Sequence, residues 1–322
     1  MSKTNTGLIR PTYSAPLVIL LTPLIIIFQI LLYVYRVFFP KTVAKSITGD
    51  IAVVTGGAGG LGRAISVELA KQGCHIVIVD VNFELAEQTA TSIHEKYKVK
   101  TKAYKVDVTN YDEVVELNKN ISNDIGKATI LVNNAGILSL SDPFNPDPIE
   151  VQRMINVNLT SHFWTNRVFL QNMKELNKGH IVAISSVAGL MPLPFNAQYT
   201  STKYAVRGLM GALKLELVMQ ERRCIKTTTV FPTFLDTNSE AVRLLEKSNS
   251  NKIFILHNGE EVAKRIIQGV LRNEEIIAIP DIASLFTRCL EFWPHDIIAF
   301  FISMTYSKNV SKEFKDLAKK KL

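Results

Sequence analysis

Cysteine is scarce in this 322-residue sequence, and its pattern excludes a disulfide framework. The three residues Cys74, Cys224 and Cys289 are odd in number and far apart, which is typical of a protein in a reducing compartment. The spacing of a zinc-ligand set is missing, so no metal ion is expected. An RNA-binding motif and a basic helical stripe are missing as well, which argues against a nucleic-acid partner.

Charged residues make up only 20% of the chain and aromatic residues 8%, while apolar residues make up 47%. This balance excludes a globally disordered chain and supplies enough apolar surface for one large α/β domain or two small ones. The net charge is +8, and part of the excess comes from Lys41, Lys45 and Lys319–Lys321. Because these lysines lie near apolar segments, we expect them to face anionic membrane lipid.

Charge is absent altogether from Pro11 to Tyr35. The apolar run Leu17–Phe39 is long enough to cross a hydrocarbon core of about 30 Å at about 1.5 Å per residue. The sequence therefore predicts an N-terminal membrane anchor over residues 1–40, and Pro23 leaves both a spanning helix and a hairpin open. The balance of basic residues on the two sides of the run favours a main domain that faces the cytosol.

A short linker, residues 41–49, leads into a regular alternation of strand and helix patterns over residues 50–282. Strands are expected at residues 50–55, 75–80, 100–106, 128–132, 179–184, 225–231 and 275–279. Repeated strand–helix units predict a parallel sheet with helices on both faces. The expected fold is α/β, a doubly wound, Rossmann-type parallel sheet of about seven strands that follows an N-terminal membrane helix.

Residues 283–322 form an apolar C-terminal segment and a basic tail. The uninterrupted apolar part, from Ile297 to Tyr306, is too short to span a membrane. A membrane-surface segment, a lid helix and a core helix all fit this pattern. The final Lys319–Leu322 resembles a dilysine retrieval signal of the endoplasmic reticulum, and a solvated basic tail is the alternative.

A glycine-rich turn connects the first expected strand to the first expected helix. Gly56, Gly60 and Gly62 let backbone N–H groups approach a pyrophosphate at the helix N-terminus, where the helix dipole favours anions. Asp80 ends the second expected strand about 20 residues further on. A carboxylate there accepts hydrogen bonds from a ribose 2′-OH and repels a 2′-phosphate, which favours NAD. A cap for the helix that begins near Phe83 is the alternative role of Asp80.

Polar residues also close the later expected strands. Asp107 can bond an adenine amino group or form an Asx turn. The segment Asn133–Gly136 lies at the carboxyl end of the fourth strand, where such sheets bind ligands, although its residues also suit a plain turn. Asn158 falls inside a long helical pattern over residues 149–176. Because asparagine is unfavourable inside a helix, its presence there suggests a specific role. Ser186 closes the fifth strand, where it can hydrogen-bond a substrate oxygen or cap a turn.

Tyr199 and Lys203 stand four residues apart in a helical pattern and so share one face of the helix. An ammonium near a phenol favours the phenolate, and a pKa lowered by about 3 units corresponds to roughly 4 kcal/mol. Such a tyrosine can take the hydroxyl proton of an alcohol while a cofactor takes its hydride. The alternative is an exposed pair of side chains on a solvated helix.

Together these segments resemble the classical short-chain dehydrogenase/reductase family over roughly residues 50–279. Thr55–Gly62 is similar to the family's TGxxxGxG turn, and Asn133–Gly136 is similar to its NNAG segment. The residues that match the family's Asn-Ser-Tyr-Lys tetrad are Asn158, Ser186, Tyr199 and Lys203. The spaced motifs occur in the family's order at the expected ends of strands and helices, which makes the resemblance specific.

The resemblance implies a role for each member of the tetrad. Tyr199 is implied to be the general acid/base, and Lys203 to lower its pKa and hold the nicotinamide ribose. Ser186 is implied to orient the substrate oxygen, and Asn158 to position a water in a proton relay. The implied cofactor-binding residues are Thr55, Gly56, Gly60, Leu61, Gly62, Asp80, Asp107, Val108, Asn134, Ala135, Gly136, Tyr199, Lys203, Pro232 and Thr237.

One departure from the family's pattern concerns the nicotinamide carboxamide. Many members have Pro-Gly after the sixth strand, whereas this chain has Pro232-Thr233, and the carboxamide contact is then expected through Thr237. The N-terminal anchor, the segment His162–Thr165 and the Lys-Lys-Lys-Leu end look like the membrane-bound branch of the family that acts on retinol and 17β-hydroxysteroids.

The sequence thus predicts a membrane-anchored oxidoreductase that transfers a hydride between NAD(H) and a lipophilic alcohol or ketone. Its expected location is the endoplasmic reticulum membrane or lipid droplets. An apolar pocket is expected between Leu190–Phe195 and Phe234–Leu256, and a homodimer is expected by family analogy through long helices at residues 149–176 and 198–219. Two rival functions are an NADPH-dependent lipid-ketone reductase and a noncatalytic protein that coats the endoplasmic reticulum or lipid droplets.

Overall fold

The computed structural model describes residues 44–139, 145–194, 196–237 and 256–281, together with residue 242 and scattered positions from 23 to 35. Most of the predicted anchor and all of the predicted C-terminal segment, residues 283–322, lie outside these described residues. Within the described part of the chain, no helix is both long enough and apolar enough to cross a membrane. The N-terminal membrane helix therefore stays a prediction.

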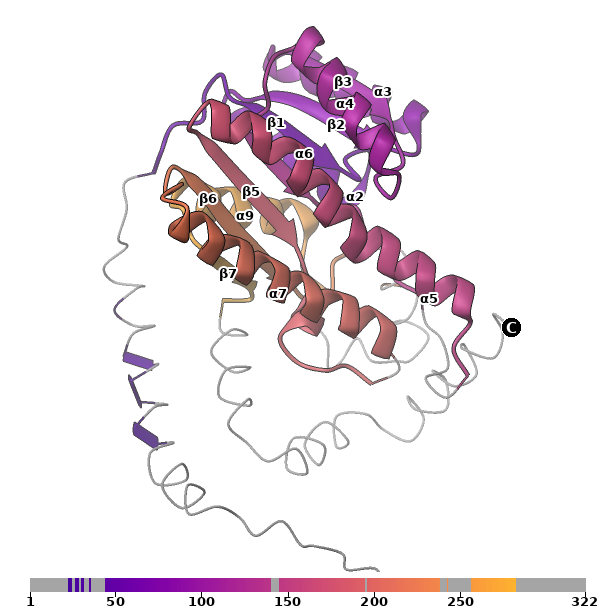
Figure 1. Cartoon of the computed structure of the whole chain (residues 1–322), viewed down its shortest axis with the longest axis vertical. Helices are drawn as coiled ribbons and strands as arrows, with labels where there is room; N and C mark the ends of the chain where they lie inside the picture. The colour runs from indigo at the N-terminus through magenta and orange to yellow at the C-terminus, as the bar shows by residue number, and fades with distance from the viewer. Residues whose placement is uncertain are drawn as a thin grey trace, which may run out of the picture.

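The centre of the fold is one parallel sheet with the strand order β3-β2-β1-β4-β5-β6-β7 (Figure 1). The strands are β1 Ile51–Thr55, β2 His75–Asp80, β3 Thr101–Lys105, β4 Ile130–Asn133, β5 Gly179–Ile184, β6 Ile225–Pro232 and β7 Ile276–Ile279. β1 pairs with both β2 and β4, so the direction in which the chain adds strands reverses at β1. Such a reversal opens a crevice at the carboxyl ends of the strands, where sheets of this type bind ligands. The predicted doubly wound sheet is confirmed.

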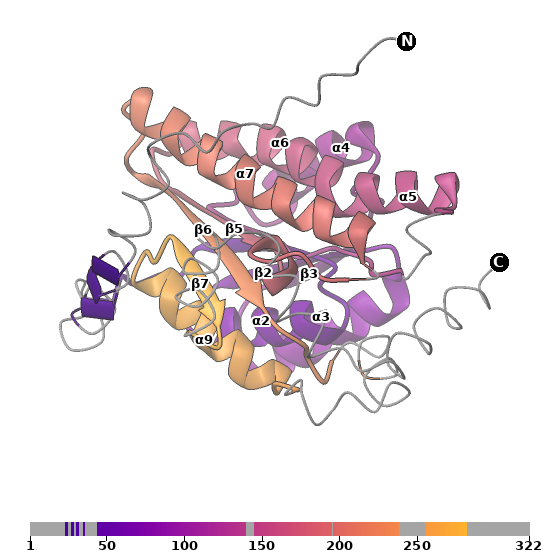
Figure 2. The same cartoon turned by 90° about the horizontal axis from the view of Figure 1, so that it is seen from below.

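Helices cover both faces of the sheet. They are α2 Gly60–Lys71, α3 Phe83–Tyr97, α4 Tyr111–Asp124, α5 Pro148–Ile155, α6 Ser161–Glu175, α7 Ala197–Met219 and α9 Gly259–Leu271. Figure 2 shows α2, α3 and α9 on one face and α4, α6 and α7 on the other. Because side chains alternate along a strand, Ala52 and Val54 of β1 pack on the first face, and Ile51 and Val53 pack on the second.

A π-helical turn divides the long helix expected at residues 149–176. α5 ends at Ile155, the π-helix η1 spans Asn156–Thr160, and α6 follows. Asn158 lies in this turn and is fully buried, and its side chain bonds to a backbone segment outside the helix. A π-turn of this kind often marks a functional site, because it redirects side chains that a regular helix would hold elsewhere.

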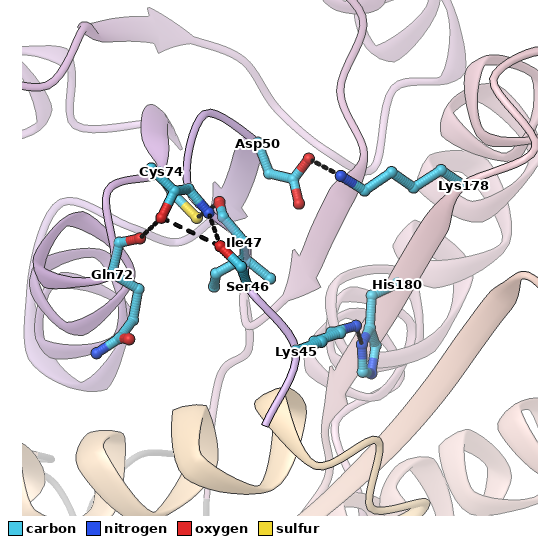
Figure 3. A network of polar contacts seen from close by, with 9 residues as sticks. Lys45, Ser46, Ile47, Asp50, Gln72, Cys74, Lys178 and His180 are labelled. Atoms are coloured by element: carbon cyan, nitrogen blue, oxygen red, sulfur yellow. Dashed lines mark hydrogen bonds and ion pairs between the residues drawn. The ribbon is translucent and has the colours of Figure 1, made fainter. Parts of the chain in front are cut away.

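A polar network fastens the start of the domain to the amino end of the sheet (Figure 3). Lys45 Nζ lies 2.7 Å from Nδ1 of His180, whose Nε2 lies 2.8 Å from Oγ1 of Thr228. Nearby, Lys178 donates to Asp50 at 2.6 Å. Burial lowers the pKa of Lys45 to about 8 and also holds the pKa of His180 well below its ordinary value. The prediction that Lys45 faces lipid headgroups is therefore wrong, because its ammonium is turned into the fold.

Candidate active site

A cleft of about 830 Å³ lies at the carboxyl ends of the strands. It is large enough for a small-molecule site. The predicted site residues that line it are Gly56, Leu61, Gly62, Asp80, Asp107, Val108, Asn134, Ala135, Gly136, Ser186, Tyr199, Lys203, Pro232 and Thr237. Thr55, Gly60 and Asn158 are not among the lining residues. The fold thus gathers segments that are far apart in the sequence around one cleft.

The glycine turn packs directly against the end of β4. Gly56 has φ +61°, a conformation that favours glycine, and a Cβ on Gly62 would lie only 2.1 Å from the carbonyl oxygen of Gly56. Thr55 Oγ1 accepts hydrogen bonds from the N–H groups of Asn134 and Ala135, at 3.0 and 3.1 Å. Thr55 therefore holds the glycine turn against the end of β4, and its predicted contact with a cofactor stays a prediction.

Helix α2 begins at this turn without a side-chain cap. Gly59 occupies the N-cap, and no acidic residue lies in the first turn of the helix. The N-terminus of a helix carries the positive end of the helix dipole, and its first N–H groups are free to bind an anion. Because the glycines of the turn have no Cβ atoms, that anion can approach the backbone closely. The turn therefore fits the diphosphate of a dinucleotide.

Asp80 lies at the end of β2 and lines the cleft beside the glycine turn. One carboxylate oxygen accepts from the N–H of Ala58 at 3.1 Å, and the other accepts from the N–H of Asn82 at 3.0 Å. The N-cap of α3 is Asn82, whose side chain accepts from the N–H of Leu85. The capping role considered for Asp80 is therefore filled by Asn82, and the carboxylate of Asp80 stays beside the turn.

Asp107 forms the Asx turn that its sequence context allows. Its Oδ1 accepts from the backbone N–H of Thr109 at 2.9 Å and from the hydroxyl of Thr109 at 2.8 Å. Asp107 and Val108 nevertheless line the cleft. The turn and an adenine contact are therefore compatible.

Tyr199 and Lys203 lie one helical turn apart on α7 and point to the same cleft. Lys203 Nζ lies 5.5 Å from the centre of the Tyr199 ring and donates to the carbonyl oxygen of Ile184 at 3.0 Å. Lys203 is only 4% exposed, so the alternative of a solvated pair is wrong. Burial lowers the pKa of Lys203 to about 8, because it disfavours the charged ammonium.

The expected lowering of the tyrosine pKa is not found. Burial raises the pKa of Tyr199, and a hydrogen bond with Ser186 opposes that rise. The physical reason is that the protein interior disfavours a phenolate, while the Lys203 ammonium is directed to a backbone carbonyl. Proton transfer at Tyr199 therefore depends on what else enters the cleft.

Ser186 and Asn158 each serve the local structure as well. Ser186 is the N-cap of the short 3-10 helix η2, Val187–Gly189, and its Oγ accepts from the N–H of Ala188 at 3.2 Å. Asn158 accepts from the N–H of Ile137 at 2.8 Å and donates to the carbonyl of Ile137 at 2.9 Å. Asn158 therefore clamps the segment that follows β4, and its predicted water-positioning role stays a prediction.

The structure also corrects and extends the expected substrate wall. Leu193 and Phe234 line the cleft as expected, whereas Leu190 packs in the core against Phe231 and Ala278. Phe195 and most of the segment that precedes Leu256 lie outside the described residues. Lining residues that the sequence did not point to include Leu138, Ser139, Glu150, Arg153 and Asn196. In the sequence these residues share only that they lie near one of the motifs. That signal is too weak to identify them as site residues from the sequence alone.

A Rossmann-type sheet whose crevice gathers a glycine turn and a Tyr-Lys helix is typical of nicotinamide-dependent dehydrogenases and reductases. The sequence of residues 50–247 matches the family model described as short chain dehydrogenase. Human estradiol 17-beta-dehydrogenase 11 is 33% identical over 282 residues, which cover 88% of this chain and 91% of that protein. Human 17-beta-hydroxysteroid dehydrogenase 13 is 32% identical over 276 residues, which cover 86% and 89%.

Solved structures show the same fold. A short-chain dehydrogenase/reductase from Burkholderia phymatum in complex with NAD has a TM-score of 0.68 at 23% identity and covers 76% of this chain and 93% of its own. L-sorbose reductase from Gluconobacter frateurii, complexed with NADPH and L-sorbose, has a TM-score of 0.66 at 23% identity and covers 72% and 94%. One neighbour holds NAD and the other NADPH, so the likeness does not decide between the two cofactors.

The chain therefore belongs to the short-chain dehydrogenase family and is an oxidoreductase. The resemblance read from its motifs is confirmed, including the relation to 17β-hydroxysteroid dehydrogenases.

Proposed function

We propose that this protein is a membrane-anchored dehydrogenase that exchanges a hydride between NAD(H) and a lipophilic alcohol or ketone. The observation that carries this proposal is the meeting of Ser186, Tyr199 and Lys203 with the glycine turn around one cleft. A noncatalytic coat protein has no need of a buried Tyr-Lys pair beside a cradle for a dinucleotide. The catalytic proposal is therefore favoured over that rival.

The residues of the cleft fit a dinucleotide. The turn from Gly56 to Gly62 would hold the diphosphate, and Asp80 would hold a ribose. Asp80 is a carboxylate beside that turn, and Val81 and Asn82 bring no positive charge for a 2′-phosphate. These residues favour NAD over NADP. When bound, nicotinamide supplies the hydride acceptor for oxidation or the hydride donor for reduction.

The tetrad would transfer the proton between the substrate oxygen and the protein. Ser186 and Tyr199 line the same cleft, so their two hydroxyl groups can hold one substrate oxygen between them. Tyr199 takes the proton of an alcohol during oxidation and returns it to the oxygen of a ketone during reduction. Lys203 lies beside the tyrosine ring with a pKa of about 8, and we propose that its ammonium supports proton transfer at Tyr199 once cofactor and substrate occupy the cleft. Asn158 keeps the segment after β4 in place around these groups.

A lipophilic substrate is supported by the relatives and by the cleft. The relatives are named as dehydrogenases of estradiol and of 17-beta-hydroxysteroids. Leu138, Leu193 and Phe234 provide apolar lining near the tetrad. A retinol, a steroid and a long-chain lipid alcohol all fit this chemistry, and an assay must choose among them.

Membrane anchoring is supported by the N-terminal run. Its described positions are helical, and the side chains of Leu24, Ile27, Phe28 and Leu31 are between 53% and 62% exposed. Apolar side chains that are left exposed in this way favour a lipid environment. We place the protein at the endoplasmic reticulum membrane or at lipid droplets, with its catalytic domain in the cytosol.

A homodimer through α6 and α7 belongs to the same proposal. Leu215, Val218 and Met219, near the end of α7, are 64%, 44% and 83% exposed, and Phe163 of α6 is 47% exposed. Apolar side chains on two neighbouring helices suit contact with a second copy.

The direct test is an assay of the full-length protein in membranes. Retinols, hydroxysteroids and long-chain alcohols are offered with NAD and separately with NADP. We expect turnover with at least one of these alcohols and a higher kcat/KM with NAD. Equal rates for wild type and for Tyr199→Phe across the whole panel would contradict the proposal.

Cofactor choice gives a separate prediction. Asp80→Asn removes the negative charge but keeps an oxygen that can accept from Ala58. We expect the ratio of kcat/KM for NAD to that for NADP to fall by about 10-fold or more, because repulsion of the 2′-phosphate is lost. The exposed Asp112→Asn, on α4, serves as the control and should leave the ratio unchanged. An unchanged ratio in Asp80→Asn would mean that Asp80 does not set the cofactor preference, whereas a wild type that prefers NADPH would favour the NADPH-dependent reductase.

Removal of residues 1–39 tests the anchor. We expect the shortened chain to leave the membrane fraction and to keep its kcat on a short, water-soluble alcohol, because the described cleft contains no residue from that segment. Sedimentation and a rate assay measure the two outcomes. Continued membrane association would show that the C-terminal segment anchors the protein instead.

A further inference from the structure

Asn196 begins α7 but does not cap it. Asparagine is among the best N-cap residues, because its side chain can accept from the first free N–H groups of a helix. The other described α-helices that begin on Asn or Asp use that side chain as a cap: Asn82, Asn110, Asp147 and Asn258. The side chain of Asn196 makes no such bond. The amide of Asn196 therefore does not serve as a helix cap.

This amide belongs to a residue in the wall of the cleft. Asn196 is one of the lining residues, and its Oδ1 is buried and has no hydrogen-bond partner among the groups that the structure describes. Buried polar atoms in native proteins are nearly always paired, so an unpaired one beside a cavity indicates a ligand atom. Asn196 precedes Tyr199 by three residues, which is about 4.5 Å along the helix axis. The amide therefore lies about one turn from the proposed acid/base.

Thr233 provides a second group of the same kind. Its backbone N–H donates to the carbonyl of Ile279 at 3.1 Å, which continues the pairing of β6 with β7 and fixes the residue at the edge of the cleft. Its Oγ1 is buried and unpaired within the described residues, and Thr233 lines the same cleft. Thr233 also stands where many family members have glycine, so this hydroxyl is an addition to the common pattern.

We propose that Asn196 and Thr233 recognise a second oxygen of the substrate, a hydroxyl or keto group that lies a few carbons from the reacting one. This proposal rests on the proposed dehydrogenase function and specifies its substrate class. A hydrocarbon chain beside the reacting carbon would leave both polar atoms buried and unpaired, which is unfavourable. A diol or hydroxyketone pairs them.

The side chains of Asn196 and Thr233 can bind both the reduced and the oxidised form of the substrate. An amide offers N–H and C=O together, and a threonine hydroxyl both donates and accepts. The same pair can therefore hold a neighbouring hydroxyl or a neighbouring keto group while the reacting carbon changes its oxidation state. The nicotinamide carboxamide has similar hydrogen-bonding chemistry, and the test must separate that source from the substrate.

The test compares three alcohols that differ in one hydroxyl: 1-hexadecanol, 1,2-hexadecanediol and 1,3-hexadecanediol. The enzymes are full-length wild type, Asn196→Leu, Thr233→Val and the double variant, with the exposed Thr91→Val of α3 as the control. For wild type we expect one of the diols to exceed 1-hexadecanol by about 10- to 100-fold in kcat/KM. The double variant should lose this preference because its kcat/KM on the diols falls toward that on 1-hexadecanol, and Thr91→Val should behave as wild type.

A binding measurement makes the result independent of turnover. The melting temperature of each protein is measured with NADH alone, with NADH plus 1-hexadecanol and with NADH plus each diol. We expect a diol to raise the melting temperature of wild type more than 1-hexadecanol does, and this difference to vanish in the double variant. If no alcohol is turned over and the diol difference is still present, the reaction proposal fails and the recognition proposal stands.

Three results would overturn the recognition proposal. An unchanged diol preference in the variants would mean that the two atoms hold only water. An equal loss on all three alcohols would assign them to general structure. A weaker Kd for NADH with no change in preference would assign them to the nicotinamide carboxamide.

Discussion

Tyr199→Phe is expected to lower kcat by about 10²- to 10⁴-fold while the Kd for NADH changes little. The substitution removes one oxygen, and positioned proton transfer contributes about this much to a rate. Tyr199 is the cleft-lining phenol that lies next to both Ser186 and Lys203. The ring remains, so the shape of the cleft and the packing of α7 are preserved. Steady-state rates and NADH fluorescence measure the two quantities.

Tyr204→Phe is the matched control for this experiment. Tyr204 lies on the same helix, is 36% exposed and does not line the cleft. We expect its kcat to stay within about twofold of wild type, because no proton transfer is assigned to it. Similar kcat losses in the two variants would mean that α7 is merely sensitive to change, and the acid/base role would be rejected.

The sheet and the glycine turn could be predicted because their sequence signals are local. Runs such as Ile51–Val54 and Ile76–Val79 are apolar throughout, as strands buried on both faces must be, and each lies in a strand that is followed by a turn and a helical pattern. The glycine motif predicted a special role for Gly62, and the structure gives the physical reason: a Cβ at this position would collide with the carbonyl oxygen of Gly56. Motif spacing then pointed to Ser186, which follows β5, and to Tyr199 and Lys203, which lie near the start of α7.

The remaining features depend on contacts between distant residues. The sequence predicts a phenol made acidic by Lys203, but the pKa of Tyr199 depends on burial by the whole fold, and burial raises it. Lys45 looks like a basic flank of the anchor until His180, far along the chain, is found beside it. The π-turn at Asn158 and the uncapped amide of Asn196 likewise follow from partners that three-dimensional packing supplies or withholds.

Acid is expected to destabilise the fold between pH 6.5 and pH 4.5, because two histidines are buried as neutral rings. His162 of α6 is 1% exposed, and burial together with the Lys203 charge lowers its pKa to about 3. His180 of β5 is also 1% exposed, and burial together with the charges of Lys45 and Lys226 lowers its pKa. Both folded pKa values lie below the value of about 6.5 for an unfolded chain, so the unfolded state binds more protons.

The free energy of unfolding therefore falls as the pH falls below about 6.5. For His162 alone, a folded pKa of about 3 implies a loss of about 3 kcal/mol by pH 4.5, and His180 adds to it in the same direction. A domain with a total stability of 5–15 kcal/mol loses a large share in this interval. Urea unfolding of the full-length chain in detergent, at half-unit steps from pH 7.5 to pH 4.5, measures the slope. A flat profile would contradict the prediction.

Two leucine variants separate the histidines, because only one of them is paired. Neither ring nitrogen of His162 has a hydrogen-bond partner in the described structure, so His162→Leu breaks no bond and should reduce the acid loss by about 3 kcal/mol with little effect at pH 7.5. His180→Leu should lower stability already at pH 7.5, because Lys45 loses its acceptor and Thr228 loses a partner. If both variants lose stability equally at pH 7.5 and keep the acid slope of wild type, the two rings do not cause the acid sensitivity.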